Sequence, residues 1–216
     1  MIFIGAPNHE YIGLAQIFVF LFITLGPMNF VRAFAEVTHG TDATFRRQLA
    51  IRTILIATIS LLLASVVGTV LLQKWLISVG AIAMAGGIIL FLVAIKSILR
   101  FYAEPAGQAQ STSTPTPAPT LAPAAERLAV PSIVTPYGVA TVIVFLTIAP
   151  EVKWAIVGLV LVIMIIDLLV MLFIRPLLRV LGVPLQLLGI VFAVLQVALS
   201  VQMILFAFRA VFAKGI

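Results

Sequence analysis

Residues 153–174 read KWAIVGLVLVIMIIDLLVMLFI, a run in which Asp167 is the one charged side chain after the first position. A helix that crosses a bilayer needs about 20 mostly apolar residues, because the hydrocarbon core is about 30 Å thick and the helix rises about 1.5 Å per residue. A strand of a membrane β-barrel would alternate apolar and polar residues, and this run does not. The run therefore predicts a membrane-spanning α-helix.

Five other runs before and after this one are also long and mostly apolar: Tyr11–Phe34, Ala50–Leu72, Leu76–Leu99, Leu128–Ile148 and Gln186–Phe212. The whole chain is 63% hydrophobic and 9% charged, with a mean hydropathy of +1.27. Soluble domains carry about 25% charged residues, so this composition excludes a soluble enzyme and a nucleic-acid-binding domain. The absence of cysteine excludes a secreted disulfide scaffold. The sequence predicts an all-α polytopic membrane protein with six transmembrane helices, surrounded by membrane lipids.

The positive charges predict an orientation in the membrane. Cytoplasmic loops of membrane proteins carry an excess of Lys and Arg. With the N-terminus outside, nine fall inside: Arg32, Arg46, Arg47, Arg52, Lys96, Arg100, Arg127, Arg175 and Arg179. Four fall outside: Lys74, Lys153, Arg209 and Lys214. We therefore expect an inner (plasma) membrane protein with both termini outside, and no cleaved signal peptide, because no basic segment precedes the first run.

A low-complexity segment divides the chain into two halves. Residues 104–126 are rich in Pro, Thr and Ala, a composition typical of a flexible linker, with a functional tail as the alternative. Residues 1–103 and 127–216 then hold three predicted spans each. Because three is odd, equivalent halves would enter the membrane from opposite sides, as in the inverted repeats of secondary transporters.

Two corresponding spans carry helix-breaking residues. Gly26-Pro27-Met28-Asn29 interrupts the first span and Thr135-Pro136-Tyr137-Gly138 the fourth. Proline removes a backbone donor, and broken backbone at membrane depth is tolerated only where protein buries it or it lines a wet cavity. The break in the first span lies about 15 residues into it, and the break in the fourth span about 7 residues into it. Both breaks are therefore expected in the inner half of the membrane, whereas a symmetric inverted repeat would place them in opposite halves.

These breaks supply the predicted substrate site. Thr24, Pro27 and Asn29 would form one half, and Thr135, Pro136, Tyr137 and Gly138 the other. Unwound helix ends offer free N–H groups to a carboxylate and free carbonyls to a cation, which suits a zwitterion. In the alternative interpretation the prolines only kink helices for packing, and Asn29 binds two helices together.

Asp167 is the only acidic residue deep inside a span. A charged side chain costs about 2.5–3.5 kcal/mol at the centre of an inserted helix, so it should face the bundle interior. It is the candidate for coupling to a proton or sodium ion. Two other interpretations remain open: a structural pair with Arg175, about two turns along the same helix, or a protonated bystander.

The last span contains two glutamines, Gln196 and Gln202, six positions apart and therefore on different faces. At least one should face the protein, as a hydrogen bond between helices or, less favoured, as a ligand contact. In the third span, Ala83, Gly86 and Gly87 form a small-residue surface that predicts close helix packing.

Catalytic motifs do not occur in the sequence. His9 and His39 lie outside the spans and cysteine is absent, so no buried His/Cys metal site is expected. No G-x-S-x-G, H-E-x-x-H or Walker glycine loop occurs. We expect a protein that is not an enzyme and needs no cofactor, with an enzyme built on an unfamiliar membrane site as the weaker alternative.

Four segments together resemble the MarC family of six-span integral membrane proteins, from about Ala15 to Val211. They are LFITLGPMNFVRAFAEVTHGTDATFRRQLAIRTILIATI (21–59), ISVGAIAMAGGIILFLVAIKSIL (77–99), AVPSIVTPYGVATVIVFL (129–146) and LSVQMILFAF (199–208). Two departures would alter ligand chemistry. The family often has an acidic residue where this chain has Gly26, and Gly-Pro-Gly where it has Thr135-Pro136-Tyr137-Gly138.

The resemblance implies transport, since some relatives are described as transporters of small neutral amino acids. We therefore expect a secondary transporter of a small solute, such as a neutral amino acid, working by alternating access around the first and fourth spans. A homo-oligomer is compatible with this prediction. The alternatives are a non-transporting scaffold or assembly protein and an ion exporter. The exporter is disfavoured because hard cations usually gather several oxygen ligands.

Overall fold

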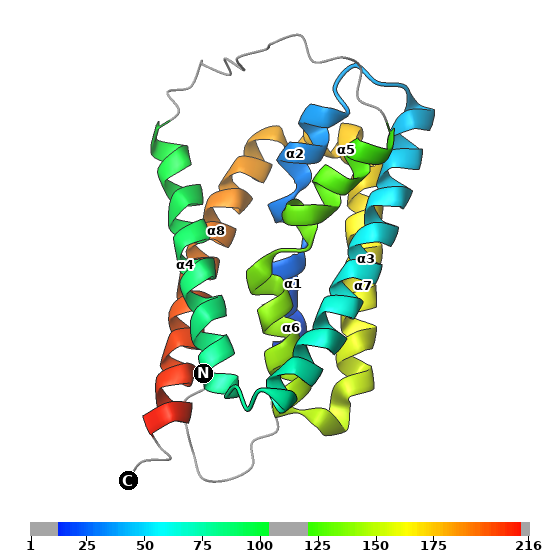
Figure 1. The fold of residues 1–216 in the computed structure, drawn as a ribbon. Helices are drawn as coiled ribbons and strands as arrows, with labels where there is room; N and C mark the ends of the chain where they lie inside the picture. The colour runs from blue at the N-terminus through cyan, green and yellow to red at the C-terminus, as the bar shows by residue number, and fades with distance from the viewer. Residues whose placement is uncertain (1–12, 104–120, 213–216) are drawn as a thin grey trace.

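The computed structural model describes residues 13–103 and 121–212, and in these ranges the chain forms helices and short turns without a β-strand (Figure 1). The α-helices are α1 (Leu14–Leu25), α2 (Val31–Val37), α3 (Ala43–Lys74), α4 (Val79–Ala103), α5 (Leu121–Leu128), α6 (Pro136–Ile148), α7 (Lys153–Leu172) and α8 (Ile174–Phe212). Short 3-10 turns cover Pro27–Asn29 and Pro150–Val152, and a π turn covers Ala129–Ile133. The predicted all-helical class is confirmed.

Five segments are long and apolar enough to cross a membrane: Leu14–Val37, Ala43–Lys74, Val79–Leu99, Pro150–Leu172 and Leu187–Ala210. The chain is thus an integral membrane protein, but the predicted count of six is not confirmed. The predicted fourth span, Leu128–Ile148, is divided among α5, the π turn and α6. The 13 residues of α6 cover about 20 Å, less than the hydrocarbon core.

Two prolines explain this division. In a continuous helix, prolines at positions 131 and 136 would remove backbone hydrogen bonds and clash with the preceding turn. The helix is interrupted instead, and Val130 adopts an extended backbone (φ −127°, ψ 120°) inside the π turn. Residues 121–126, at the end of the predicted linker, belong to α5. The rest of that linker, 104–120, lies outside the described residues.

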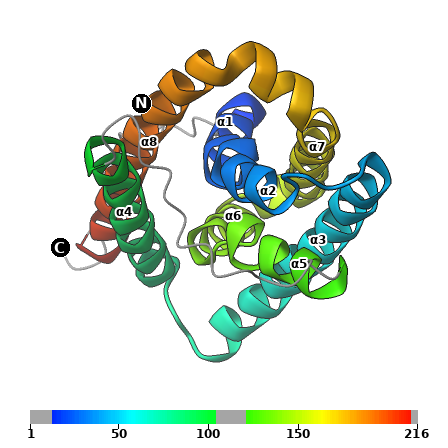
Figure 2. The same ribbon diagram turned by 90° about the horizontal axis from the view of Figure 1, so that it is seen from above.

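The final helix begins earlier than the sequence predicts. The predicted loop after Ile174 is helical, so that α8 is a continuous helix of 39 residues in place of a span starting at Gln186. Seen from above, its first part curves from α7 around one end of the bundle, and the rest descends beside α4 (Figures 1 and 2). The sequence in this region contains Pro184, and proline is a usual cause of bends in long helices.

The helices form a central pair and two flanking pairs. Helices α1 and α6 lie in the middle, with α4 packed along α8 on one side and α3 against α7 on the other (Figures 1 and 2). Helices α2 and α5 lie at one end of the bundle together with the C-terminal end of α4 (Figure 1). This end, where α4 ends and α5 begins, is called the linker end below.

The outer faces of the helices are apolar. On α3, five large side chains are more than half exposed: Leu55, Ile59, Leu63, Val66 and Val67. The opposite face of the same helix is buried, as at Leu49, Ala57 and Leu61. An apolar outer face on a helix with a packed inner face is expected when lipid is the surrounding solvent.

Candidate functional site

The break in α1 follows from the residues at its end. In a continuous helix, the Ile23 carbonyl would accept a hydrogen bond from the backbone of residue 27, and Pro27 has no N–H. The amide of Gln196, on α8, takes that place: its Nε2 donates to the Ile23 carbonyl over 3.1 Å. The Thr24 carbonyl accepts from Nδ2 of Asn29 over 3.0 Å. Two side chains therefore replace the backbone donors that the break removes.

The second break forms the start of α6. Thr135 is the N-cap, and its hydroxyl oxygen accepts a hydrogen bond from the Gly138 N–H over 3.1 Å. Pro136 occupies the first helical position, where its missing N–H has no intrahelical partner to lose. A Cβ on Gly138 would lie 2.6 Å from Leu25 Cδ2, so the two breaks pack directly against one another.

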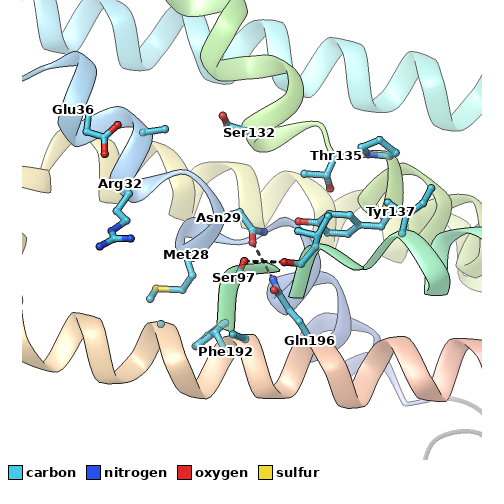
Figure 3. A pocket seen from close by; sticks show the side chains of 16 residues that line it. Met28, Asn29, Arg32, Glu36, Ser97, Ser132, Thr135, Tyr137, Phe192 and Gln196 are labelled. Carbon is cyan, nitrogen blue, oxygen red and sulfur yellow. Dashed lines mark hydrogen bonds between the residues drawn. The ribbon is translucent and has the colours of Figure 1, made fainter. Parts of the chain in front are cut away.

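A partly open cavity of about 710 Å³ lies where the breaks meet (Figure 3). It is lined by five of the residues predicted from the sequence: Asn29, Thr135, Pro136, Tyr137 and Gln196. Gln196 also donates through Nε2 to Oδ1 of Asn29 over 2.9 Å. The structure thus brings together side chains from three separate segments at one polar surface.

The cavity has two walls. One wall consists of the broken segments and α2, with Ser132 as a further polar residue (Figure 3). The other consists of α4, through Ile89, Val93 and Ser97, and α8, through Gly189, Phe192, Ala193 and Gln196. Arg32 and Glu36 of α2 and Ser97 near the C-terminal end of α4 also line the cavity, so the cavity extends toward the linker end.

Charged residues line the cavity toward the linker end. Arg32 and Glu36 both project from α2, one turn apart (Figure 3). Neither was among the residues predicted from the sequence. Their spacing of four, directly after the Pro27 break, places them on one helix face and is the signal that identifies them. Ser97 and Ser132 carry no comparable signal, because single serines are common in apolar helices.

The opposite end of the cavity is closed by packing between α1 and α6. The rings of Phe20 and Phe145 meet edge to face with their centroids 5.4 Å apart. Tyr137 is 3% exposed, and neither residues 14–25 nor residues 139–148 contribute to the cavity lining. The cavity therefore does not continue between these half-helices.

The family of this chain is shown by a match along nearly its whole length. The sequence profile described as MarC family integral membrane protein matches residues 12–212. The chain belongs to the MarC family. The resemblance seen from Ala15 to Val211 is thereby confirmed. No curated protein and no solved structure matches the chain.

Gly26 and Thr135 both have a structural role in this chain. A Cβ on Gly26 would clash with the Phe22 carbonyl oxygen, which accepts a hydrogen bond from the Gly26 N–H over 2.9 Å. The end of α1 therefore requires glycine at this position. Thr135 provides the N-cap of α6.

Several predicted site residues of this MarC chain lie outside the cavity lining. The Thr24 hydroxyl donates to the carbonyls of Phe20 and Leu21, within its own helix. Pro27 is buried at the break, and Gly138 packs on Leu25. Gln202 is part-buried further along α8. The other position outside the lining is Asp167.

Asp167 is fully buried on α7. Neither of its carboxylate oxygens has a hydrogen-bond partner among the described residues. The structural pair with Arg175 is not formed, because Arg175 is the second residue of α8, beyond the end of α7, and donates through Nη2 to the Thr41 carbonyl over 2.6 Å. In the described ranges, no group of three or more His, Cys, Asp or Glu could hold a metal ion.

Proposed function

We propose that this MarC-family chain is a secondary transporter of a small zwitterionic solute, such as a neutral amino acid. The observation that carries the proposal is the cavity of about 710 Å³ at the meeting point of two broken helices. It extends toward one end of the bundle and is closed at the other by Phe20 and Phe145. This is the arrangement expected of one state in an alternating-access cycle.

The polar groups of the cavity suit a zwitterion. The N-terminus of α6 carries the positive end of a helix dipole, and in its first turn the N–H groups of Gly138 and Val139 already bond to Thr135. The Tyr137 N–H is the donor that remains for a carboxylate. The C-terminus of α1 carries the negative end of its dipole, and Oδ1 of Asn29 lies beside it, so an ammonium group is favoured there.

An inverted repeat would supply the second state. Its support is that each helix packs against its counterpart in the other half: α4 on α8, α3 on α7 and α1 on α6. Pro27 and Pro136 are 109 residues apart, and so are Gly80 and Gly189 in the third and last spans. Helices α5 and α6 together count as one broken span in this comparison. If the two halves of the chain exchanged their conformations, the cavity would open to the opposite end of the bundle.

Asp167 is the candidate coupling residue in this proposal. A buried carboxylate without a partner is costly when ionised, so it favours a proton or a small cation. Because Asp167 is outside the cavity lining, coupling would pass through the packing of α7 against α1 rather than through contact with the solute. The protein would lie in the inner (plasma) membrane of the cell. Its linker end would face the cytoplasm.

Uptake of labelled neutral amino acids into proteoliposomes tests the proposal. Glycine, L-alanine and L-serine would be offered under imposed proton or sodium gradients. Gradient-driven uptake of at least one supports the transporter. Folded protein that moves none of them under either gradient overturns it and favours the scaffold, while gradient-driven movement of metal cations alone favours the ion exporter.

A further inference from the structure

Gln196 joins the two walls of the cavity. It lies on α8 and is 5% exposed, and both hydrogens of its amide are used, one by the Ile23 carbonyl and one by Oδ1 of Asn29. Both acceptors belong to the α1 break. A longer contact also joins α8 to the central pair: the Thr141 hydroxyl of α6 donates to the Met203 sulfur of α8 over 3.9 Å.

The wall that contains Gln196 is a tightly packed pair of helices. A Cβ on Gly87 of α4 would lie 3.0 Å from the Ser200 carbonyl of α8 and 2.9 Å from Ile204 Cγ1. Ser200 is one turn from Gln196 on the same helix. Helices in such close contact resist sliding apart, because the interior on both sides is filled. A displacement of α8 at Gln196 therefore carries α4 with it.

Asn29 connects this bond to the contents of the cavity. Its Oδ1 accepts from Gln196, its Nδ2 donates to the Thr24 carbonyl, and the residue lines the cavity. A solute ammonium that approaches Oδ1 would compete with the Gln196 amide for the same acceptor. Binding at Asn29 would thereby weaken the bond between the walls.

We propose that Gln196 is a positioning residue that holds the α4–α8 pair against the α1 break in the arrangement seen here, and that it releases Asn29 when solute occupies the cavity. The release step rests on the proposed transport function. The holding step does not, because it concerns the empty protein. Gln196 acts through Asn29 and the Ile23 carbonyl rather than by chemistry on the solute.

Spin-label distances in the empty protein test the holding step. The chain has no cysteine, so labels at Leu99→Cys on α4 and Glu126→Cys on α5 report the separation of the walls without background. Both positions are exposed and lie outside the cavity lining. In nanodiscs without solute, Gln196→Met should broaden the distance distribution about twofold or shift its mean, because a minor arrangement gains population.

Gln202→Met is the matched control, since it makes the same change on the same helix outside the cavity lining. It should leave the distribution as in the native chain. An unchanged distribution in folded Gln196→Met protein overturns the proposal, as does an equal change in the control. If Gln196→Met does not fold, Gln196→Glu takes its place, because it keeps the shape but replaces the donating nitrogen with an oxygen.

L-alanine provides the second arm. In the native chain, L-alanine should shift the distances between the two labels toward a smaller separation of the walls. In Gln196→Met, this shift should be largely lost. If no neutral amino acid shifts the native chain while Gln196→Met still broadens the empty state, the proposed substrate fails and the holding role stands. If L-alanine shifts native and Gln196→Met proteins equally, the releasing role fails and the transporter stands.

Discussion

Individual buried polar groups in this protein fall into two classes. The buried Thr24 and Gln196 and the part-buried Asn29 form a connected set: the Thr24 hydroxyl, Asn29 Nδ2 and Gln196 Nε2 each donate a hydrogen bond. In contrast, the carboxylate of Asp167 and the hydroxyl of Thr53 are buried without a partner in the described part of the chain. Satisfied groups hold a structure in place, whereas unsatisfied buried groups cost free energy and are candidates for function.

Substitution of Asp167 by Asn should separate coupling from solute binding. Removing the ionisable group should abolish net uptake driven by an ion gradient while leaving solute exchange between the two sides within about twofold of the native rate. The thermal unfolding temperature should stay the same or rise, because an unpartnered acid is removed. Uptake and counterflow in proteoliposomes measure both effects. Glu151→Gln, which removes an exposed carboxylate at the end of the bundle opposite the linker end, is the control. Gradient-driven uptake that persists in Asp167→Asn would leave Asp167 with a structural role only.

At the scale of elements, the break in α1 and the bond from α8 depend on each other. Pro27 removes the donor for the Ile23 carbonyl, and Gln196 restores it from another helix. A break in a membrane helix therefore needs a partner that the local sequence does not contain. This dependence makes a specific double substitution informative.

Pro27→Ala should reduce the cost of losing Gln196. Gln196→Met alone leaves the Ile23 carbonyl without its donor and should lower the free energy of unfolding by about 1–3 kcal/mol. In a Pro27→Ala background, a backbone N–H is again available, and the same change should cost about 1 kcal/mol less. Unfolding in detergent measures the four proteins of the cycle. Strict additivity of the two changes would show that Gln196 does not replace the missing donor.

Helix α4 depends on glycine for its contact with α8. Gly87→Ala places a Cβ 3.0 Å from the Ser200 backbone carbonyl and should destabilise the protein by about 1–3 kcal/mol through overpacking. A Cβ on Gly158, inside α7, would meet no atom of a neighbouring element within 4 Å. Gly158→Ala should therefore be neutral or stabilising by up to about 1 kcal/mol, since alanine favours helix. Equal thermal shifts for the two variants would contradict this account of the contact.

The two ends of the whole molecule differ in chemistry. Arg46, Arg47 and Arg52 lie in the first three turns of α3 at the linker end, while Trp75 and Trp154 lie at the opposite end and are 68% and 78% exposed. Lys153 lies over the Trp154 ring, 5.7 Å from its centroid. Arginine-rich ends favour the cytoplasm, and tryptophan favours a membrane interface.

Labelling of single cysteines tests the proposed orientation. Thr44→Cys lies at the linker end, and Ser78→Cys lies in the turn between α3 and α4 at the opposite end; both positions are exposed. In intact cells, a membrane-impermeant maleimide should modify Ser78→Cys and reach Thr44→Cys only after permeabilisation. The reverse pattern would place the linker end outside and invert the proposed direction of the cavity.

The amino-acid sequence by itself determined that the protein is helical and lies in a membrane, because composition and run length decide which solvent a helix can face. It also located both breaks, since Pro27 and Pro136 act through their own backbone. Five of the residues that line the cavity could be predicted from it, because polar groups beside a break are rare in apolar helices. The order and spacing of its motifs identified the MarC family.

Other features were decided only by the tertiary structure. The bond of Gln196 to the α1 break joins residues 173 positions apart, and no local pattern specifies it. The continuous helix α8 is a second such feature, because it runs past Pro176 and Pro184, residues that locally disfavour a helix. The separation of Asp167 from the cavity depends on how α7 is rotated about its axis. Asp167 requires its own face to be buried, but the remaining apolar residues of α7 do not specify which neighbouring helix that face meets.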